Sequence, residues 1–122
     1  MPTILIVDDE YGIAETIGDV LSAYGYTVET AMNGKAALAT LSRTHPDVIL
    51  LDVMMPIMTG PELLGALRQS DEYRQTPVVM MSAVGPEALS AEDAARANGF
   101  LVKPFTFDEL LATLGRVLDS PA

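Results

Sequence analysis

The chain has 122 residues, of which 49% are hydrophobic and 20% charged, and this length and balance suit one compact domain with a real core. Its 17 acidic residues outnumber 7 basic ones, and the resulting net charge of -10 repels nucleic acid and argues against direct binding to it. With no cysteine and with His45 as its single histidine, the chain cannot form a disulfide, a thiolate metal site or a Cys nucleophile, and a Ser-His-Asp triad would need His45 itself.

The first part of the chain predicts two strands separated by a helix. Residues 3–7 are a continuous apolar run of strand length. Apolar side chains then recur at helical spacing over residues 11–23, Gly25 ends this helix, and residues 26–30 predict a second strand. The start of the chain has no signal-peptide pattern, and no apolar run approaches the roughly 20 residues of a membrane helix, so we expect a soluble, cytoplasmic chain with no membrane partner.

The middle of the chain predicts two helices around a third strand. Asn33 can cap a helix that ends before Pro46. Residues 48–51 predict the third strand. Thr59 and Glu62 have the spacing of a capping box, in which each side chain bonds the backbone N–H of the other, ahead of a leucine-rich helix.

The last part of the chain predicts two more strands and two more helices. Residues 77–81 predict the fourth strand, and a weaker, alanine-rich helix is expected within residues 86–97. Residues 100–102 predict the fifth strand. Thr106 and Glu109 again fit a capping box at the start of the final helix.

Strands and helices therefore alternate along the whole sequence. Strands separated by helices pair in parallel, and continuously apolar strands indicate that helices cover both faces of the sheet. The sequence predicts an α/β fold, a three-layer doubly wound sandwich with a five-stranded parallel sheet and five helices, in a single domain over residues 1–122.

Charged or hydroxyl side chains follow every predicted strand except the second. In open parallel sheets, ligands bind at the carboxyl ends of the strands, near the point where the strand order reverses. All of these side chains are therefore expected at one edge of the sheet. They are Asp8, Asp9, Glu10, Asp52, Ser82 and Lys103.

The residue types at this edge suit phosphoryl chemistry. Asp8, Asp9 and Asp52 offer carboxylates without a nitrogen or sulfur donor, a set that suits Mg²⁺, with Mn²⁺ as an alternative ion. Lys103 would add a point cation and Ser82 a hydroxyl donor, which together would stabilise charge on phosphoryl oxygens. One carboxylate could then act as a nucleophile and form an acyl phosphate, and Asp52, the lone acid at its strand end, is the candidate.

Each signal, taken alone, also fits a purely structural role. An Asp-Asp pair after a strand often forms a turn and a helix cap, and Asp52 could equally cap a turn. A serine at a strand end, or a lysine before a proline, indicates no function by itself. Their joint placement at the ends of several strands of one predicted sheet is what favours a site.

Five stretches, in order, resemble the receiver domain of two-component response regulators, a family that includes chemotaxis regulators. They are ILIVDDE, NGKAAL, PDVILLDVMMPIMTG, PVVMMSA and FLVKPF, and they span nearly all of the chain. The resemblance implies a flavodoxin-like fold with strand order 2-1-3-4-5. It also implies a cytoplasmic phosphoprotein that acts in a phosphorelay.

The resemblance implies a metal-dependent phosphorylation site. Asp52 matches the phosphoacceptor of the family. Asp8 and Asp9 match the acidic pair that holds Mg²⁺, and Asp52 and the backbone carbonyl of Met54 would complete the protein ligands.

A second group of residues matches the family's phosphate-binding and switch positions. Ser82, followed by Ala83, matches the hydroxyl that turns toward the phosphoryl oxygen, and Phe100 matches the aromatic side chain that moves with it. Lys103 matches the phosphate-binding lysine, and its bond to Pro104 matches a cis peptide. Because Phe100 lacks a hydroxyl, it can report its position only by packing.

The sequence departs from the family pattern around the fourth helix. Residues 96–99, Arg-Ala-Asn-Gly, stand where the family commonly has Gly-Ala followed by acidic residues, and the span from Ser82 to Lys103 is slightly short.

Met54 and Val84 are apolar at positions linked in the family to dephosphorylation rate, and neither would position a hydrolytic water. These two residues favour a longer-lived phosphoryl group.

We expect a phosphorylation-driven switch rather than a turnover enzyme. A histidine kinase or histidine phosphotransfer protein would phosphorylate Asp52, and the face formed by the fourth helix, fifth strand and fifth helix would change its affinity for a downstream partner or a second copy. The alternative is a receiver-like binding module that works without phosphorylation. A metabolic enzyme is disfavoured because Walker A and Gly-x-Gly-x-x-Gly motifs are absent, and because Met54 stands where an Asp-x-Asp phosphatase needs an acid.

Overall fold

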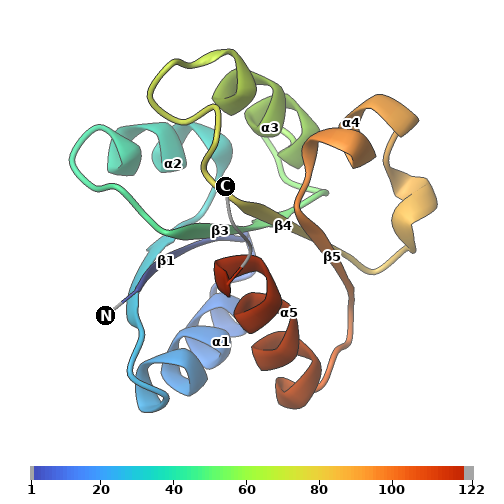
Figure 1. Ribbon diagram of the computed structural model, residues 1–122. Helices are drawn as coiled ribbons and strands as arrows, with labels where there is room; N and C mark the ends of the chain where they lie inside the picture. The colour runs from blue at the N-terminus through green and yellow to red at the C-terminus, as the bar shows by residue number, and fades with distance from the viewer. Residues whose placement is uncertain (1, 120–122) are drawn as a thin grey trace.

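A parallel sheet with strand order β2-β1-β3-β4-β5 organises the computed structural model, which describes residues 2–119 (Figure 1). This result confirms the predicted fold class and strand order. The strands are β1 (Thr3–Val7), β2 (Thr27–Ala31), β3 (Val48–Asp52), β4 (Val78–Ser82) and β5 (Gly99–Val102). The helices are α1 (Tyr11–Ala23), α2 (Gly34–Leu41), α3 (Gly60–Gln69), the 3₁₀ turn η1 (Pro86–Ala88), α4 (Ala91–Arg96) and α5 (Phe107–Asp119).

Helices cover both faces of the sheet and divide the core in two. Figure 1 shows α1 and α5 on one face, and α2, α3 and α4 on the other. Because side chains alternate along a strand, Ile4 and Ile6 of β1 pack toward α1 and α5, whereas Leu5 and Val7 pack toward α2 and α3. The strands β3 and β4 are buried along their whole length, which explains why they are almost purely apolar in sequence.

The predicted caps fix where several helices begin. The Asn33 side chain accepts a hydrogen bond of 2.7 Å from the N–H of Ala36 at the start of α2. Both bonds of the Thr59–Glu62 capping box are formed at α3. The same reciprocal pair joins Thr106 and Glu109 at the start of α5, with both bonds at 3.0 Å. These predictions are confirmed.

The region between β4 and β5 holds the weaker helix expected within residues 86–97, in a short form. It contains the single turn η1 and then the short helix α4, which Ser90 caps by accepting a bond from the N–H of Asp93. No residue of α4 is buried, because its alanines do not make an apolar stripe wide enough to anchor a longer helix. Elsewhere the strand ends differ from the predictions by about one residue. None of the helices within residues 2–119 is long and apolar enough to span a membrane.

A close approach at Gly60 sets the path of the chain after β3. The N–H of Gly60 donates to the carbonyl of Val53 at 3.0 Å, which folds the start of α3 back onto the end of the strand. A Cβ at this position would overlap the Asp52 carbonyl oxygen and lie 2.9 Å from Cα of Val53. The loop can therefore close over Asp52 only if position 60 has no side chain.

We expect Gly60→Ala to destabilise the chain by about 2–3 kcal/mol, because the new methyl group must displace the backbone of Asp52 and Val53. Urea unfolding, followed by circular dichroism, measures this change. Gly115→Ala in α5 is the matched control, because no atom lies within 4 Å of its new Cβ, and helix propensity should raise its stability slightly. Equal stability of the two variants would contradict this account of the loop.

Candidate functional site

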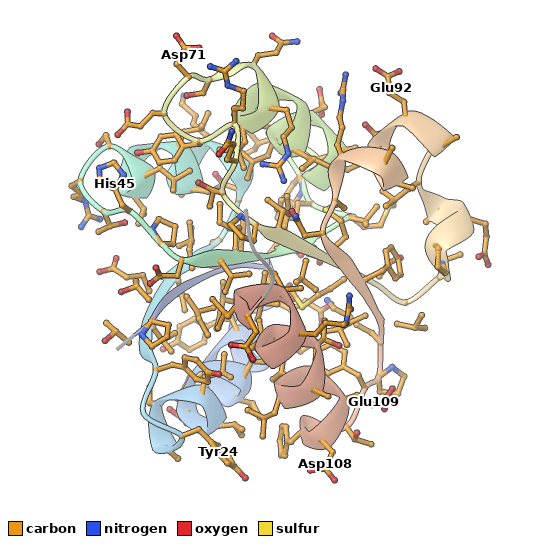
Figure 2. The ribbon with its side chains drawn as sticks, viewed as in Figure 1. Tyr24, His45, Asp71, Glu92, Asp108 and Glu109 are labelled. Atoms are coloured by element: carbon orange, nitrogen blue, oxygen red, sulfur yellow. The ribbon has the colours of Figure 1, made fainter. Side chains whose placement is uncertain are left out.

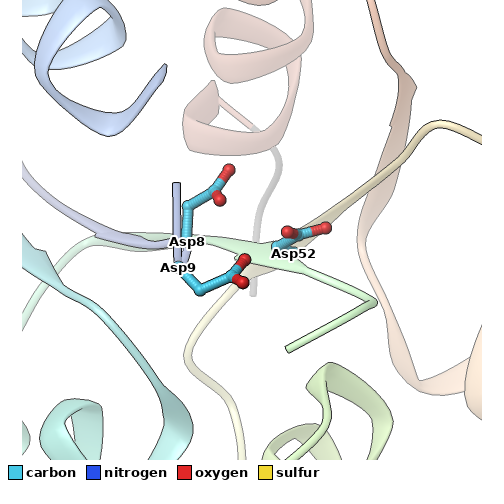
Figure 3. Close-up of side chains that lie close together, drawn as sticks. All are labelled: Asp8, Asp9 and Asp52. Carbon is cyan, nitrogen blue, oxygen red and sulfur yellow. The ribbon is translucent and has the colours of Figure 1, made fainter. Parts of the chain in front are cut away.

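Three aspartates meet at the carboxyl ends of β1 and β3. Asp8 and Asp9 directly follow β1, and Asp52 is the last residue of the neighbouring strand β3. One carboxylate oxygen from each residue lies within 4.8 Å of the other two, and Figure 3 shows the three side chains gathered at this edge. Asp8 and Asp52 are buried, and Asp9 is half-buried. The predicted carboxylate cluster therefore exists in the fold.

Lys103 directly follows the edge strand β5, and its side chain extends to this cluster. Its Nζ lies 2.8 Å from Oδ2 of Asp8 and 3.4 Å from Oδ2 of Asp52. The backbone of Lys103 is held there, because its N–H donates to the Ser82 carbonyl at 2.8 Å. The peptide bond between Lys103 and Pro104 is cis. With a side chain only 13% exposed, the ammonium group is shielded from solvent and strengthens both ion pairs.

The carboxylate cluster has more negative than positive charge, and this imbalance shifts the pKa values of its members. Burial and the negative charge of Asp8 raise the pKa of Asp52 from 3.8 to about 6, although the charge and hydrogen bond of Lys103 oppose this shift. Burial alone would lower the pKa of Lys103, but its contacts with Asp8 and Asp52 outweigh that effect and raise it. One ammonium group faces three carboxylates, so the site favours a further cation.

The two switch candidates lie in different environments. Ser82 ends β4 beside β3 and is buried, and its Oγ accepts a 3.0 Å hydrogen bond from the N–H of Val84. Ala83 is exposed next to it. Phe100 lies near the start of β5, half-buried against the core that faces α2 and α3, so it packs apart from the carboxylates.

Local hydrogen bonds test the structural alternatives for the aspartates. Asp8 does stabilise a turn, since its Oδ1 accepts a 2.9 Å bond from the N–H of Glu10. The N-cap residue of α1, however, is Glu10 and not Asp9, and its side chain makes no capping bond. Within its own turn, Asp52 accepts one long bond, of 3.4 Å, from the N–H of Met54. Turn and cap formation therefore leave most of the oxygen atoms of this cluster available.

An apolar groove beside Lys103 was not predicted from the sequence. It has a volume of about 490 Å³ and runs between α1 and the segment that joins β5 to α5. The only signal in the sequence is the pair of aromatic residues after Lys103-Pro104, and one of them, Phe107, is 48% exposed. The groove is lined by Glu10, Gly12, Ile13, Thr16, Ile17, Ala83, Lys103, Pro104, Phe105 and Phe107.

The sheet is doubly wound and parallel, and a carboxylate cluster and a lysine lie at the carboxyl ends of its strands, where the strand order reverses. This combination is typical of α/β signalling and phosphoryl-transfer domains. Residues 4–115 match the response regulator receiver domain family. The chain belongs to this family, whose members are phosphorylation-activated signalling switches of two-component systems. Receiver domains bind Mg²⁺ at an acidic pocket and work with histidine kinases or phosphotransfer proteins.

Individual relatives agree with this assignment. The chain is 34% identical over 119 residues to the phosphate regulon transcriptional regulatory protein PhoB of Rhizobium meliloti, covering 97% of this chain and 52% of that protein. It is 39% identical over 117 residues to the regulatory protein AtoC of Escherichia coli, covering 94% of this chain and 25% of that protein. The chain thus spans about half or less of these curated relatives.

Solved structures support the same fold in detail. The chemotaxis response regulator CheY4 of Vibrio cholerae superimposes with a TM-score of 0.88 at 42% identity, over 96% of this chain and 98% of that one. The response regulator TrrA of Thermotoga maritima, in complex with Mg²⁺-BeF, gives a TM-score of 0.86 at 32% identity, over 96% and 99% of the two chains. Both likenesses cover 96% of this chain.

Without metal, we expect Asp52→Asn to stabilise the fold at pH 7.5 by about 1–2 kcal/mol, because it removes a carboxylate whose pKa burial and Asp8 have raised to about 6. In the wild type this carboxyl binds a proton more tightly when folded, so its penalty is absent below about pH 4 and grows as the pH rises to about 6. Urea unfolding in chelator across this range should show the variant's advantage shrink as the pH falls.

Asp71→Asn is the matched control for this experiment. It removes one negative charge from a side chain that is 96% exposed and points away from the sheet (Figure 2). Its stability should follow that of the wild type at every pH. An Asp52→Asn variant less stable than the wild type at pH 7.5 would show that the carboxylate cluster is not under electrostatic strain.

Proposed function

We propose that residues 1–122 form one receiver domain in which Asp52 accepts a phosphoryl group from a phosphohistidine donor. The observation that carries the proposal is the convergence of three carboxylates and Lys103 at one strand edge. The carboxylates of Asp8, Asp9 and Asp52, with the backbone carbonyl of Met54, would hold Mg²⁺. Mn²⁺ is the alternative, since both ions take oxygen ligands.

The side chains divide the work of the transfer between them. A carboxylate oxygen of Asp52 attacks phosphorus while the N–P bond of the donor breaks and its electron pair returns to the imidazole ring. Lys103, already 3.4 Å from Asp52, contacts a phosphoryl oxygen and offsets its charge. The Ser82 hydroxyl turns from its bond with Val84 to donate to the same group. Bound Mg²⁺ would neutralise charge on the phosphoryl oxygens and on the carboxylates.

The domain is proposed to act as a switch and not as a turnover enzyme. It promotes only the phosphorylation and dephosphorylation of its own Asp52, in the cytoplasm, and binds neither a membrane nor nucleic acid directly. Met54, 72% exposed, and Val84, 54% exposed, flank the site with apolar side chains that cannot orient an attacking water. The phosphoryl group is therefore expected to be long-lived.

The groove beside Lys103 suits the donor protein. Its lining is mainly apolar and includes the exposed Phe107 and the partly buried Ile13, and it reaches Lys103, which contacts Asp52. A donor helix that fills the groove would bring its phosphohistidine to the carboxylates. A downstream partner or a second copy would bind a different surface, formed by α4, β5 and α5. The apolar side chain of Val102 is 46% exposed on it.

We expect acetyl phosphate with Mg²⁺ to add one phosphoryl group to the wild type and none to Asp52→Asn. Asp8 is held by short bonds of 2.8 Å to Lys103 and 2.9 Å to the N–H of Glu10, whereas Asp52 has only longer contacts of 3.4 Å to Lys103 and to the N–H of Met54, so its oxygens are freer to attack. Intact-mass spectrometry measures the addition, and peptide mapping after borohydride reduction locates it. Asp71→Asn, an exposed acid far from the cluster, should be phosphorylated like the wild type. Phosphorylation of Asp52→Asn at Asp8 or Asp9 would contradict the assignment.

We also expect Phe107→Asp to slow transfer from a phosphorylated histidine kinase by about tenfold or more, because a buried charge in an apolar interface is strongly unfavourable. Phosphorylation by acetyl phosphate, which needs no groove, should be unchanged. Tyr24→Asp is the control, since this tyrosine is also exposed but lies just beyond the other end of α1 (Figure 2). Equal rates of kinase transfer in both variants would place the donor elsewhere.

A further inference from the structure

The helix α4 has little apolar packing of its own. None of its residues is buried, and the first apolar anchor before it is Leu89. An open pocket of about 210 Å³ lies beside this segment, and Leu89, Ala97 and Phe100 are among the residues that line it. Elements with few buried apolar contacts open at a low free-energy cost, so another interaction must hold α4 in place.

Arg68 at the end of α3 supplies that interaction. Its Nε donates to the carbonyl of Arg96, the last residue of α4, at 3.0 Å. Its Nη2 donates at 3.0 Å to Oδ1 of Asn98, directly before β5. Its Nη1 donates to three carbonyls of the α3–β4 loop, of which that of Thr76 is nearest at 2.8 Å. One planar guanidinium group thus joins α3, α4, β5 and this loop.

The Arg68 contacts differ from an ordinary ion pair. Among residues 2–119, no ion pair joins Arg68 to a carboxylate, and every acceptor is a carbonyl oxygen. The fork-like geometry of arginine is therefore used to bind four backbone carbonyls and one side-chain amide, and a lysine ammonium group does not have this planar fork. Asn98 is shared, because its Oδ1 also accepts a 2.9 Å bond from the N–H of Val78 in β4.

These contacts lie on the path between the two switch candidates. Ser82 and Phe100 flank the segment that contains α4, and the Arg68 bonds to Arg96 and Asn98 end two residues before Phe100. A movement of Phe100 toward Ser82 would pull on residues that Arg68 holds. The Arg96 side chain also lies beside Gly65, one turn before Arg68 in α3.

We propose that Arg68 is a positioning residue that latches the end of α4 and the start of β5 to α3, and that this latch opposes the change produced by phosphorylation. The proposal rests on the function assigned to Asp52. When the Arg68 bonds to Arg96 and Asn98 are formed, they stabilise this position of α4 relative to any conformation in which α4 has moved and the bonds are broken. Weakening the latch should therefore favour the phosphorylated state, and strengthening it should disfavour that state.

Two variants change the latch in opposite directions. Arg68→Gln removes most of its hydrogen bonds. Asn98→Asp keeps the acceptor for the N–H of Val78 and places a carboxylate against the guanidinium group, which makes the bond charge-assisted. Arg74→Gln is the control, because it also removes one positive charge but loses only an exposed ion pair with Asp71.

Hydrogen exchange without any ligand tests the latch itself. Amides of residues 91–99 should exchange about tenfold faster in Arg68→Gln than in the wild type, while those of β1 and β3 stay unchanged. They should exchange more slowly in Asn98→Asp. If Arg68→Gln exchanges like the control, or if exchange rises throughout the chain, the latch does not exist as proposed.

Titration with beryllofluoride and Mg²⁺, followed by NMR, tests the coupling to the switch. Arg68→Gln should bind this phosphoryl mimic about three- to tenfold more tightly than the wild type, and Asn98→Asp more weakly. A purely structural role would leave both affinities unchanged and would overturn the proposal. If Arg68→Gln does not fold, the weaker binding expected for Asn98→Asp decides the question. A wild type that binds no mimic would instead contradict the function assigned to Asp52.

Discussion

The structure depends on placing three carboxylates at one edge of a sheet with a single ammonium group among them. The strand order makes this possible, because β1 and β3 are neighbours in space although α1, β2 and α2 separate them in sequence. Lys103 then closes the site from β5, two strands beyond β3. Remove this lysine and the buried Asp8 loses its only cationic partner among the described residues. The same strand order therefore brings the carboxylates together and supplies the ammonium group that partly neutralises them.

A site of this kind opposes folding, and the sheet beneath it offsets the cost. The raised pKa of Asp52 means that its ionised form has a higher free energy in the folded chain than in the unfolded chain. The strands β1, β3 and β4 compensate with side chains that are buried on both faces. The loop after β3 is a second place of strain, since Ile57, a β-branched residue, has a φ of 70°. Ile57 lies in the loop that joins the end of β3 to α3, so this second feature is close in sequence to Asp52.

The sequence predicted what depends on short-range patterns and on the geometry of parallel sheets. Asp8 and Asp52 could be placed together because the carboxyl ends of parallel strands share an edge, and Asn33 and Thr59 could be recognised as caps from their spacing alone. The groove near Phe107 and the contacts of Arg68 could not be predicted. They depend on which helix faces which loop, and an arginine that binds backbone carbonyls leaves no partner residue type to find in the sequence. For α4, the low apolar content predicted a weak helix within residues 86–97, but it did not predict the separate turn η1 before it.

The remaining physical question is how a change at a rigid strand end reaches a distant surface, and the distribution of packing answers it. Asp52 belongs to the most deeply buried part of the sheet, where side chains have no room for a second arrangement. Between Ser82 and Phe100, by contrast, α4 has no buried residue, and the Arg68 bonds to Arg96 and Asn98 hold its C-terminal end beside an open pocket. Under the function proposed for Asp52, a phosphoryl group bonded by Ser82 would therefore change the conformation of the α4 region more easily than that of the buried strands. This difference in packing is the physical basis for proposing α4 as the part of the chain that responds.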